Sequence, residues 1–148
     1  MEVNTQYFGT VSCAEEDLIH FPEGLYGFQQ YKSYIPLAFQ EDSDALICLQ
    51  SVEEYGISFI VMNPFLLDPD YSPILSADDK TMLDATQNED SISYYVISVI
   101  HDSMEDSTVN LKCPIAVNAQ TRMARQVILD NPLYQIRHKI SSFGKKGG

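Results

Sequence analysis

Apolar residues along this chain alternate mostly with a period of two, and many of them are β-branched or aromatic. This pattern predicts β-strands with one buried face. The runs 45–50 and 57–62 are apolar on both faces, which indicates two covered central strands joined by the turn 53–56. Further strands are expected at 4–11, 18–21, 34–39, 92–100, 109–117 and 123–129, and the polar loop 119–122 predicts a hairpin between 115–118 and 123–129.

The expected strand at 109–117 carries Val109, Leu111 and Cys113 on one face, but it also contains Pro114. Proline has no amide hydrogen to donate to a neighbouring strand. We therefore expect this strand to lie at a sheet edge, or to be broken or bulged at Pro114.

Helix signals are few. Ser76 to Asp79 resembles a capping box, which predicts a short helix at about 77–85, and a turn or two is expected at 27–32. About eight short strands with tight connections predict a mainly β protein, a small closed or strongly curled antiparallel β-barrel-like domain with one short helix. We expect one domain over residues 1–143 and a flexible tail at 144–148.

Charge is divided along the 148 residues. Residues 1–110 hold 20 of the 21 acidic residues and two basic ones, whereas 111–148 hold one acid and seven bases, so −18 and +6 give the total of −12. A surface this acidic repels nucleic acid and attracts basic proteins. An alternative explanation is that the excess of acidic residues only keeps the protein soluble. The basic residues of the C-terminal part are expected to pair with acids of the same chain or to contact an acidic patch on a partner.

Other classes find little support. Three scattered cysteines without a CxxC pair, and no apolar signal region, predict reduced thiols and a cytoplasmic location. No window approaches 18 apolar residues, so no membrane span is expected. Asp68 to Ser72 resembles the start of a calcium-binding loop. However, Pro73 occupies the position where such a loop needs glycine, and Asp79 occupies the position where it needs glutamate. No catalytic motif or ligand-spaced histidine appears, so we expect no metal, no cofactor and no enzymatic activity.

The most distinctive segment is 21–28, Phe-Pro-Glu-Gly-Leu-Tyr-Gly-Phe. Two glycines and a proline force a compact turn, and the apolar side chains need cover, which predicts a tightly packed corner after a strand. The residues expected to shape this corner and the broken strand are Phe21, Pro22, Gly24, Leu25, Gly27, Phe28, Asn110 and Pro114.

This segment also resembles the F-P-x-G-L-x-G-F element of the flagellar assembly factor FliW family. Later features follow in the same order: 49–51 resembles an L-Q-S strand, and 62–64 with 70–71 resembles a v-x-d-P then D-Y run, with Asn63 in place of the usual Asp. Residues 108–115 resemble T-V-N-L-x-x-P-I, and 126–129 with Tyr134 resemble the closing strand. The similarity spans roughly residues 3–137.

The resemblance implies a small cytoplasmic protein without catalytic activity that binds flagellin and the carbon storage regulator CsrA, a basic dimeric RNA-binding repressor of flagellin translation. Sequestering CsrA would release flagellin mRNA for translation. We expect no direct contact with nucleic acid or membrane, and a monomer when free. The exposed-looking loop acids expected to contact a partner are Glu53, Glu54, Asp68 and Asp70, and the apolar anchors expected beside them are Tyr55 and Tyr71.

Two alternatives remain open from the sequence. One is a general acidic inhibitor of another nucleic-acid-binding protein, which partner identity would distinguish. The other is a small-ligand enzyme on a β-barrel, which would show a deep pocket with convergent titratable groups.

Overall fold

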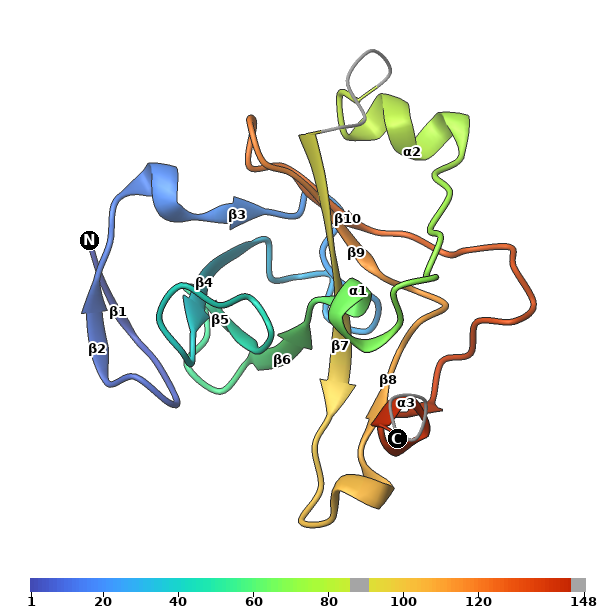
Figure 1. The fold of residues 1–148 in the computed structure, drawn as a ribbon. Helices are drawn as coiled ribbons and strands as arrows, with labels where there is room; N and C mark the ends of the chain where they lie inside the picture. The colour runs from blue at the N-terminus through green and yellow to red at the C-terminus, as the bar shows by residue number, and fades with distance from the viewer. Residues whose placement is uncertain (86–90, 145–148) are drawn as a thin grey trace.

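The computed structural model describes residues 1–85 and 91–144, and these form a mainly antiparallel β protein with a few short helices (Figure 1). The strands are β1 Glu2–Asn4, β2 Thr10–Ser12, β3 Ile19–His20, β4 Ser33–Ala38, β5 Ile47–Ser51, β6 Ser58–Met62, β7 Ile92–Val99, β8 Thr108–Val109, β9 Ile115–Asn118, β10 Ala124–Gln126 and β11 His138–Lys139. The helices are α1 Pro64–Leu67, α2 Ala77–Met82 and α3 Ser141–Gly144, with short 3-10 helices η1 Glu15–Asp17 and η3 Met104–Asp106.

One antiparallel sheet runs in the order β10-β9-β7-β6-β5-β4-β3, and β8 pairs with both β7 and β11. The sheet curls so strongly that its two ends meet. His20 of β3 forms a single parallel bridge with Met123, beside β10, and the His20 amide donates a 2.9 Å hydrogen bond to the Arg122 carbonyl. We call this contact the seam. The mainly antiparallel β prediction is thus confirmed, but a closed barrel is not, because one bridge is no continuous strand pairing.

The N-terminal strands correct one prediction. Residues 4–11 do not form one strand, because β1 and β2 pair as a separate hairpin. Gly9 makes this reversal possible with a φ of +66°, and its carbonyl accepts hydrogen bonds from the amide and the hydroxyl of Thr5. The period-two pattern continues through the turn, so it did not reveal the reversal.

The break predicted at Pro114 is present. The chain leaves the ladder after β8 and returns to it in β9. Asn110 stabilises the intervening bend, since its Oδ1 accepts a 2.9 Å hydrogen bond from the Cys113 amide. The hairpin of β9 with β10 is also confirmed, although β10 is shorter than the predicted strand. The helix predicted near 77–85 is α2, capped by Ser76, whereas α1, α3 and β11 were not predicted.

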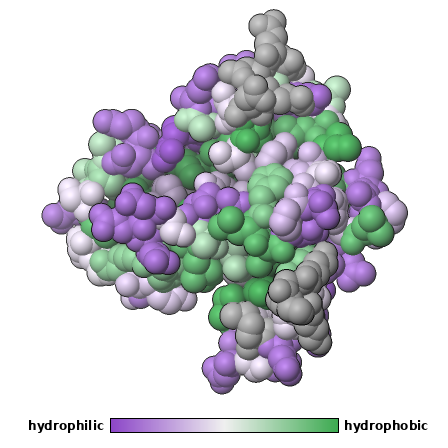
Figure 2. All heavy atoms as spheres, viewed as in Figure 1, coloured by the Kyte–Doolittle hydropathy of each residue, from purple (hydrophilic) through white to green (hydrophobic). Residues whose placement is uncertain are grey.

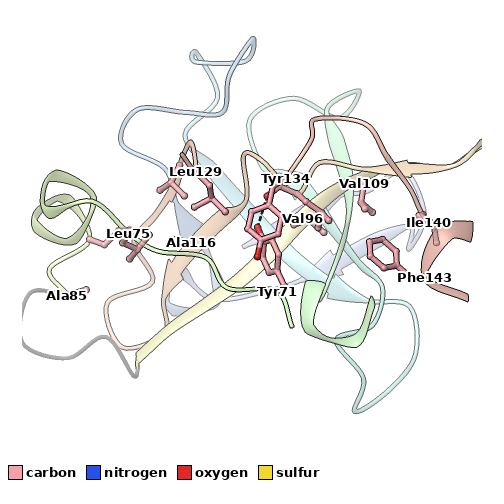
Figure 3. Packing of buried hydrophobic residues seen from close by; sticks show 13 residues of the cluster. Tyr71, Leu75, Ala85, Val96, Val109, Ala116, Leu129, Tyr134, Ile140 and Phe143 are labelled. Atoms are coloured by element: carbon pink, nitrogen blue, oxygen red, sulfur yellow. Dashed lines mark hydrogen bonds between the residues drawn. The ribbon is translucent and has the colours of Figure 1, made fainter. Parts of the chain in front are cut away.

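Strand β7 separates two apolar cores, because successive side chains of a strand face opposite sides of the sheet. Tyr94 and Val96 face an outer core, where residues from 71–85 and from the C-terminal segment cover the sheet (Figure 3). Tyr95 and Ile97 face an inner core inside the curl. A third, smaller cluster lies between the β1–β2 hairpin and β4. The predicted tail at 144–148 lies outside the described residues, apart from Gly144, which ends α3.

Candidate partner-binding surface

The corner at 21–28 packs as the sequence predicts. Phe21 and Leu25 are buried in the inner core, and Phe28 packs against it at the edge. Gly24 has a φ of +69°, and an added Cβ would lie 2.5 Å from the main chain of Gln29. Gly27 also has a positive φ, of +87°, but open space surrounds it. The corner therefore requires glycine at both positions, for backbone conformation at Gly27 and for space as well at Gly24.

Pro22 and Tyr26 of the same corner are exposed, so the corner has a solvent face as well as a packed one. The Tyr26 amide donates a 3.0 Å hydrogen bond to the side-chain oxygen of Gln126 in β10, which ties the corner to the sheet.

The turn between β5 and β6 holds three of the predicted contact residues. Glu53 has a structural role, because its Oε1 accepts hydrogen bonds of 2.6 Å and 2.9 Å from the amides of Lys32 and Ser33. Glu54 and Tyr55 are exposed, and 57% of the Tyr55 surface is accessible. Glu53 is exposed as well, but its carboxylate is engaged by the main chain, so Glu54 and Tyr55 are the better candidates of this turn for contact with a partner.

The segment after α1 holds the other three. Asp70 is exposed, and Asp68 is half-buried with its Oδ1 accepting a hydrogen bond from the Asp70 amide. Tyr71 is only 3% exposed, and its ring packs 4.7 Å from that of Tyr134 in the outer core (Figure 3). The expectation that Tyr71 is an exposed anchor is therefore wrong. Its alternation with acids in the sequence does not distinguish a buried ring from an exposed one.

The two acidic segments do not form one surface. Gln50 pairs with Ser58 at one end of the β5–β6 ladder, next to the 53–56 turn, and Ile47 pairs with Val61 at the other end, next to α1. Glu54 and Asp70 consequently lie beyond opposite ends of β6. A small partner that contacts one segment need not contact the other.

The Asp70 segment borders an apolar groove of about 370 Å³, which we call the Leu133 groove. It is lined by Asp68, Asp70, Leu111, Leu133, Tyr134, His138, Ser142 and Phe143. Leu133 is 75% exposed, and Asp68 and Asp70 line the same groove. Apolar surface together with carboxylates suits a partner that presents an apolar side chain flanked by basic ones.

More apolar surface lies nearby. Phe65 and Leu66 of α1 are exposed, as is Ile74 in the segment leading to α2. Figure 2 shows apolar side chains over α1 and along this segment, separated by polar patches. The sequence pattern did not indicate that Leu133 and Ile74 are exposed. Each follows a proline, at 132 and 73, and an apolar residue in a proline-containing loop is the signal that could have indicated them.

Among the basic residues of the C-terminal part, Arg125 pairs with acids of the same chain. Arg125 of β10 lies 3.3 Å from Glu23 of the corner and 3.3 Å and 3.5 Å from Asp79 and Asp78 of α2. These ion pairs join three segments that lie far apart in the sequence. The prediction of internal pairing is confirmed for this arginine.

Within residues 1–85 and 91–144, no three His, Cys, Asp or Glu side chains are grouped closely enough to hold a metal ion. The same residues include no helix with the length and apolarity to cross a bilayer.

Comparison with known proteins decides the family. The model of the family described as FliW protein matches residues 2–140. The chain belongs to the FliW family. It is 39% identical over 147 residues to the flagellar assembly factor FliW of Shouchella clausii, which covers 99% of each chain. It is 36% identical over 140 residues to that of Caldanaerobacter subterraneus subsp. tengcongensis, covering 95% of this chain and 93% of the relative.

The fold is also that of the FliW family. The crystal structure of a flagellar assembly factor FliW superposes with a TM-score of 0.86 at 31% identity, covering 95% of this chain and 96% of the other. The resemblance carried by the 21–28 corner and the later segments is thereby confirmed. Which residues contact a partner is a separate question, and the surfaces above are candidates for it.

Proposed function

We propose that this chain is a non-enzymatic cytoplasmic flagellar assembly factor that binds flagellin and sequesters CsrA, thereby relieving translational repression of flagellin mRNA. Membership of the FliW family carries this proposal, because the chain matches flagellar assembly factors over nearly their whole length. The charge of −18 in residues 1–110 supports it, since a strongly acidic protein attracts a basic RNA-binding partner and repels the RNA.

The Leu133 groove is the contact that we assign to CsrA. Charge alone gives a fast but loose encounter, and stable binding needs an apolar anchor in a desolvated place. Leu133 supplies exposed apolar surface, and Asp70 supplies charge beside it. The 53–56 turn is the weaker candidate, because Glu53 is engaged by two main-chain amides.

Titration of purified CsrA with wild type, Asp70→Lys and Glu54→Lys tests this assignment, at low and at moderate salt. Both variants change the net charge by +2 at an exposed acid, so Glu54→Lys controls for the overall field. We expect Asp70→Lys to weaken binding at least tenfold and Glu54→Lys to have a smaller, salt-sensitive effect. Equal weakening by both variants rejects the groove as the contact, and no binding by wild type rejects the partner itself.

Saturating RNA then separates two ways of releasing the mRNA. If RNA lowers only the apparent affinity of CsrA for this protein, and RNA and this protein fully displace each other from CsrA, they compete for one surface of CsrA. If a ternary complex forms with altered RNA affinity, the effect is allosteric, and this protein's affinity must change by the same factor. Addition of flagellin to the complex tests the second partner, since release of CsrA is the expected result.

A further inference from the structure

The inner core inside the curled sheet is not completely filled. A cavity of about 220 Å³ lies there, and its walls come from β3 to β7, from β9 and from the loop after β9. The apolar residues that line it are Ile19, Pro36, Ile47, Leu49 and Val61, together with Ile115 and Val117 of β9. A cavity of about 150 Å³ lined by aliphatic side chains accommodates benzene, so this one has room for a chain of about eight carbons.

Arg122 lies at the wall of this cavity and its backbone is fixed by the seam. Its φ is +63°, its amide donates to the Asn118 carbonyl, and its carbonyl accepts from His20. Its guanidinium donates 2.8 Å and 3.4 Å hydrogen bonds to the main-chain carbonyls of Asp17 and Leu18. The side chain is therefore held in place by neutral partners.

The charge of Arg122 has no carboxylate partner in the part of the chain that the structure describes, whereas Arg125 has three. Two main-chain carbonyls occupy only some of the five N–H donors of a guanidinium. A fixed cation with donors to spare, next to an apolar cavity, is the arrangement that receives the head of an amphipathic anion.

Tyr95 also lines the cavity, beside Ser93. Burial raises the pKa of its hydroxyl, the Asp44 charge raises it further, and Arg122 lowers it. The hydroxyl is therefore protonated at neutral pH and can donate a hydrogen bond. The nearby negative charge of Asp44 disfavours a doubly charged head such as a phosphate, and a single carboxylate meets less repulsion.

We propose that this cavity binds an aliphatic carboxylate, with the chain inside the curled sheet and the carboxylate on the Arg122 guanidinium and the Tyr95 hydroxyl. Two sources share this chemistry: a free medium-chain fatty acid, and the apolar C-terminal residue of a polypeptide. The inference is independent of the CsrA contact assigned above, because the cavity and the Leu133 groove have no lining residue in common.

Octanoate is the probe, followed by calorimetric titration and by the midpoint of thermal unfolding. We expect the melting temperature to rise with octanoate concentration, as for any ligand of the folded state. Octanamide, which lacks the charge, is expected to bind at least fivefold more weakly. Arg122→Gln should weaken octanoate binding at least fivefold, whereas Arg137→Gln, the same charge change at an exposed residue outside the cavity, should leave it unchanged.

Arg122→Gln also removes hydrogen bonds, so a second variant protects the test against loss of folding. Ala119 is exposed and lines the cavity, and Ala119→Trp is expected to obstruct it while the protein stays folded. The proposal is overturned if octanoate binds wild type no better than octanamide, or if Ala119→Trp and Arg122→Gln bind it as wild type does.

A peptide ending in leucine separates the two sources. If it binds more tightly than octanoate and C-terminal amidation abolishes this binding, the ligand is a chain terminus. If octanoate binds and the peptide does not, the ligand is a free acid. If neither binds at millimolar concentration, the cavity is not a carboxylate site.

Discussion

The Tyr71 hydroxyl donates a 2.7 Å hydrogen bond to the main-chain carbonyl of Leu111. Leu111 lies in the bend between β8 and β9, where the broken strand leaves its carbonyl without a ladder partner. The tyrosine supplies the missing donor and its ring packs on Tyr134. The residue that was expected to be a surface anchor thus stabilises the bend between β8 and β9.

Tyr71→Phe should therefore destabilise the protein by about 1–3 kcal/mol, because it leaves a buried carbonyl unsatisfied. Chemical unfolding monitored by circular dichroism measures this. A loss below about 0.5 kcal/mol would show that the bend does not depend on this hydrogen bond.

Tyr34→Phe should have the opposite sign. The Tyr34 ring is fully buried, and its hydroxyl has no hydrogen-bond partner within the described residues. Replacing an unsatisfied buried hydroxyl by hydrogen should leave stability unchanged or raise it by about 1 kcal/mol. The same unfolding assay, run in parallel with Tyr71→Phe, compares the two buried tyrosines. A clear loss of stability would contradict the placement of the Tyr34 hydroxyl.

Alkaline pH provides an independent test of Tyr34. Burial raises its pKa from 10.0 to about 12, and the Glu53 charge adds to the effect. Below about pH 10 the hydroxyl is protonated in both states, and above it the unfolded chain releases the proton first, so stability falls as pH rises through about 12. Tyr34→Phe should show a shallower fall over this window than wild type. Tyr55→Phe, at an exposed site, is the matched control.

The two glycines of the 21–28 corner should differ in their response to alanine. Gly24→Ala forces the new Cβ against the Gln29 main chain and should cost about 2–4 kcal/mol, whereas Gly27→Ala meets open space and should cost only the ~1–2 kcal/mol of a left-handed backbone. Thermal unfolding of both variants checks the order. Equal losses would mean that close packing at Gly24 contributes nothing.

The Arg125 ion pairs should be dominated by Asp79, which is 13% exposed, whereas the Asp78 side chain is 78% exposed. Asp79→Asn should lower stability by about 1 kcal/mol or more, and Asp78→Asn by less than about 0.5 kcal/mol, because exposed pairs are screened by water and salt. A double-mutant cycle with Arg125→Met isolates the pair. A coupling energy near zero would indicate that packing, and not charge, holds α2 against β10.

The sequence predicted the central strands because their apolar runs are long and bounded by turn residues, as at 47–51 and 58–62. It predicted α2 because Ser76 and Asp79 form a local capping box. It missed β11, two residues whose pairing with β8 depends on contacts some 30 positions away in the chain. It did not reveal that Tyr71 is buried or that Leu133 is exposed, because exposure depends on which segments cover a residue and not on its neighbours in sequence.

The sequence predicted the 21–28 corner better than it predicted the positions of the charged residues. The glycines of 21–28 could be assigned a packing role because backbone geometry is a local property. The separation of Glu54 from Asp70 could not be foreseen, since it follows from the direction of β6. Similarly, Arg122 and Arg125 look alike in sequence but have different surroundings. Arg125 is paired with three acids, whereas Arg122 lies beside an apolar cavity.

The seam joins His20 to Met123, so residues about a hundred positions apart complete the curl of the sheet. Contacts that distant are slow to form, because a long loop must close before they stabilise anything. During synthesis β3 to β6 can pair as successive antiparallel neighbours, but the inner core stays open along one side until β9 and β10 have emerged from the ribosome. Most of the chain must therefore be made before the apolar interior is shielded from water, and the charge of −18 in residues 1–110 favours solubility of the growing chain meanwhile.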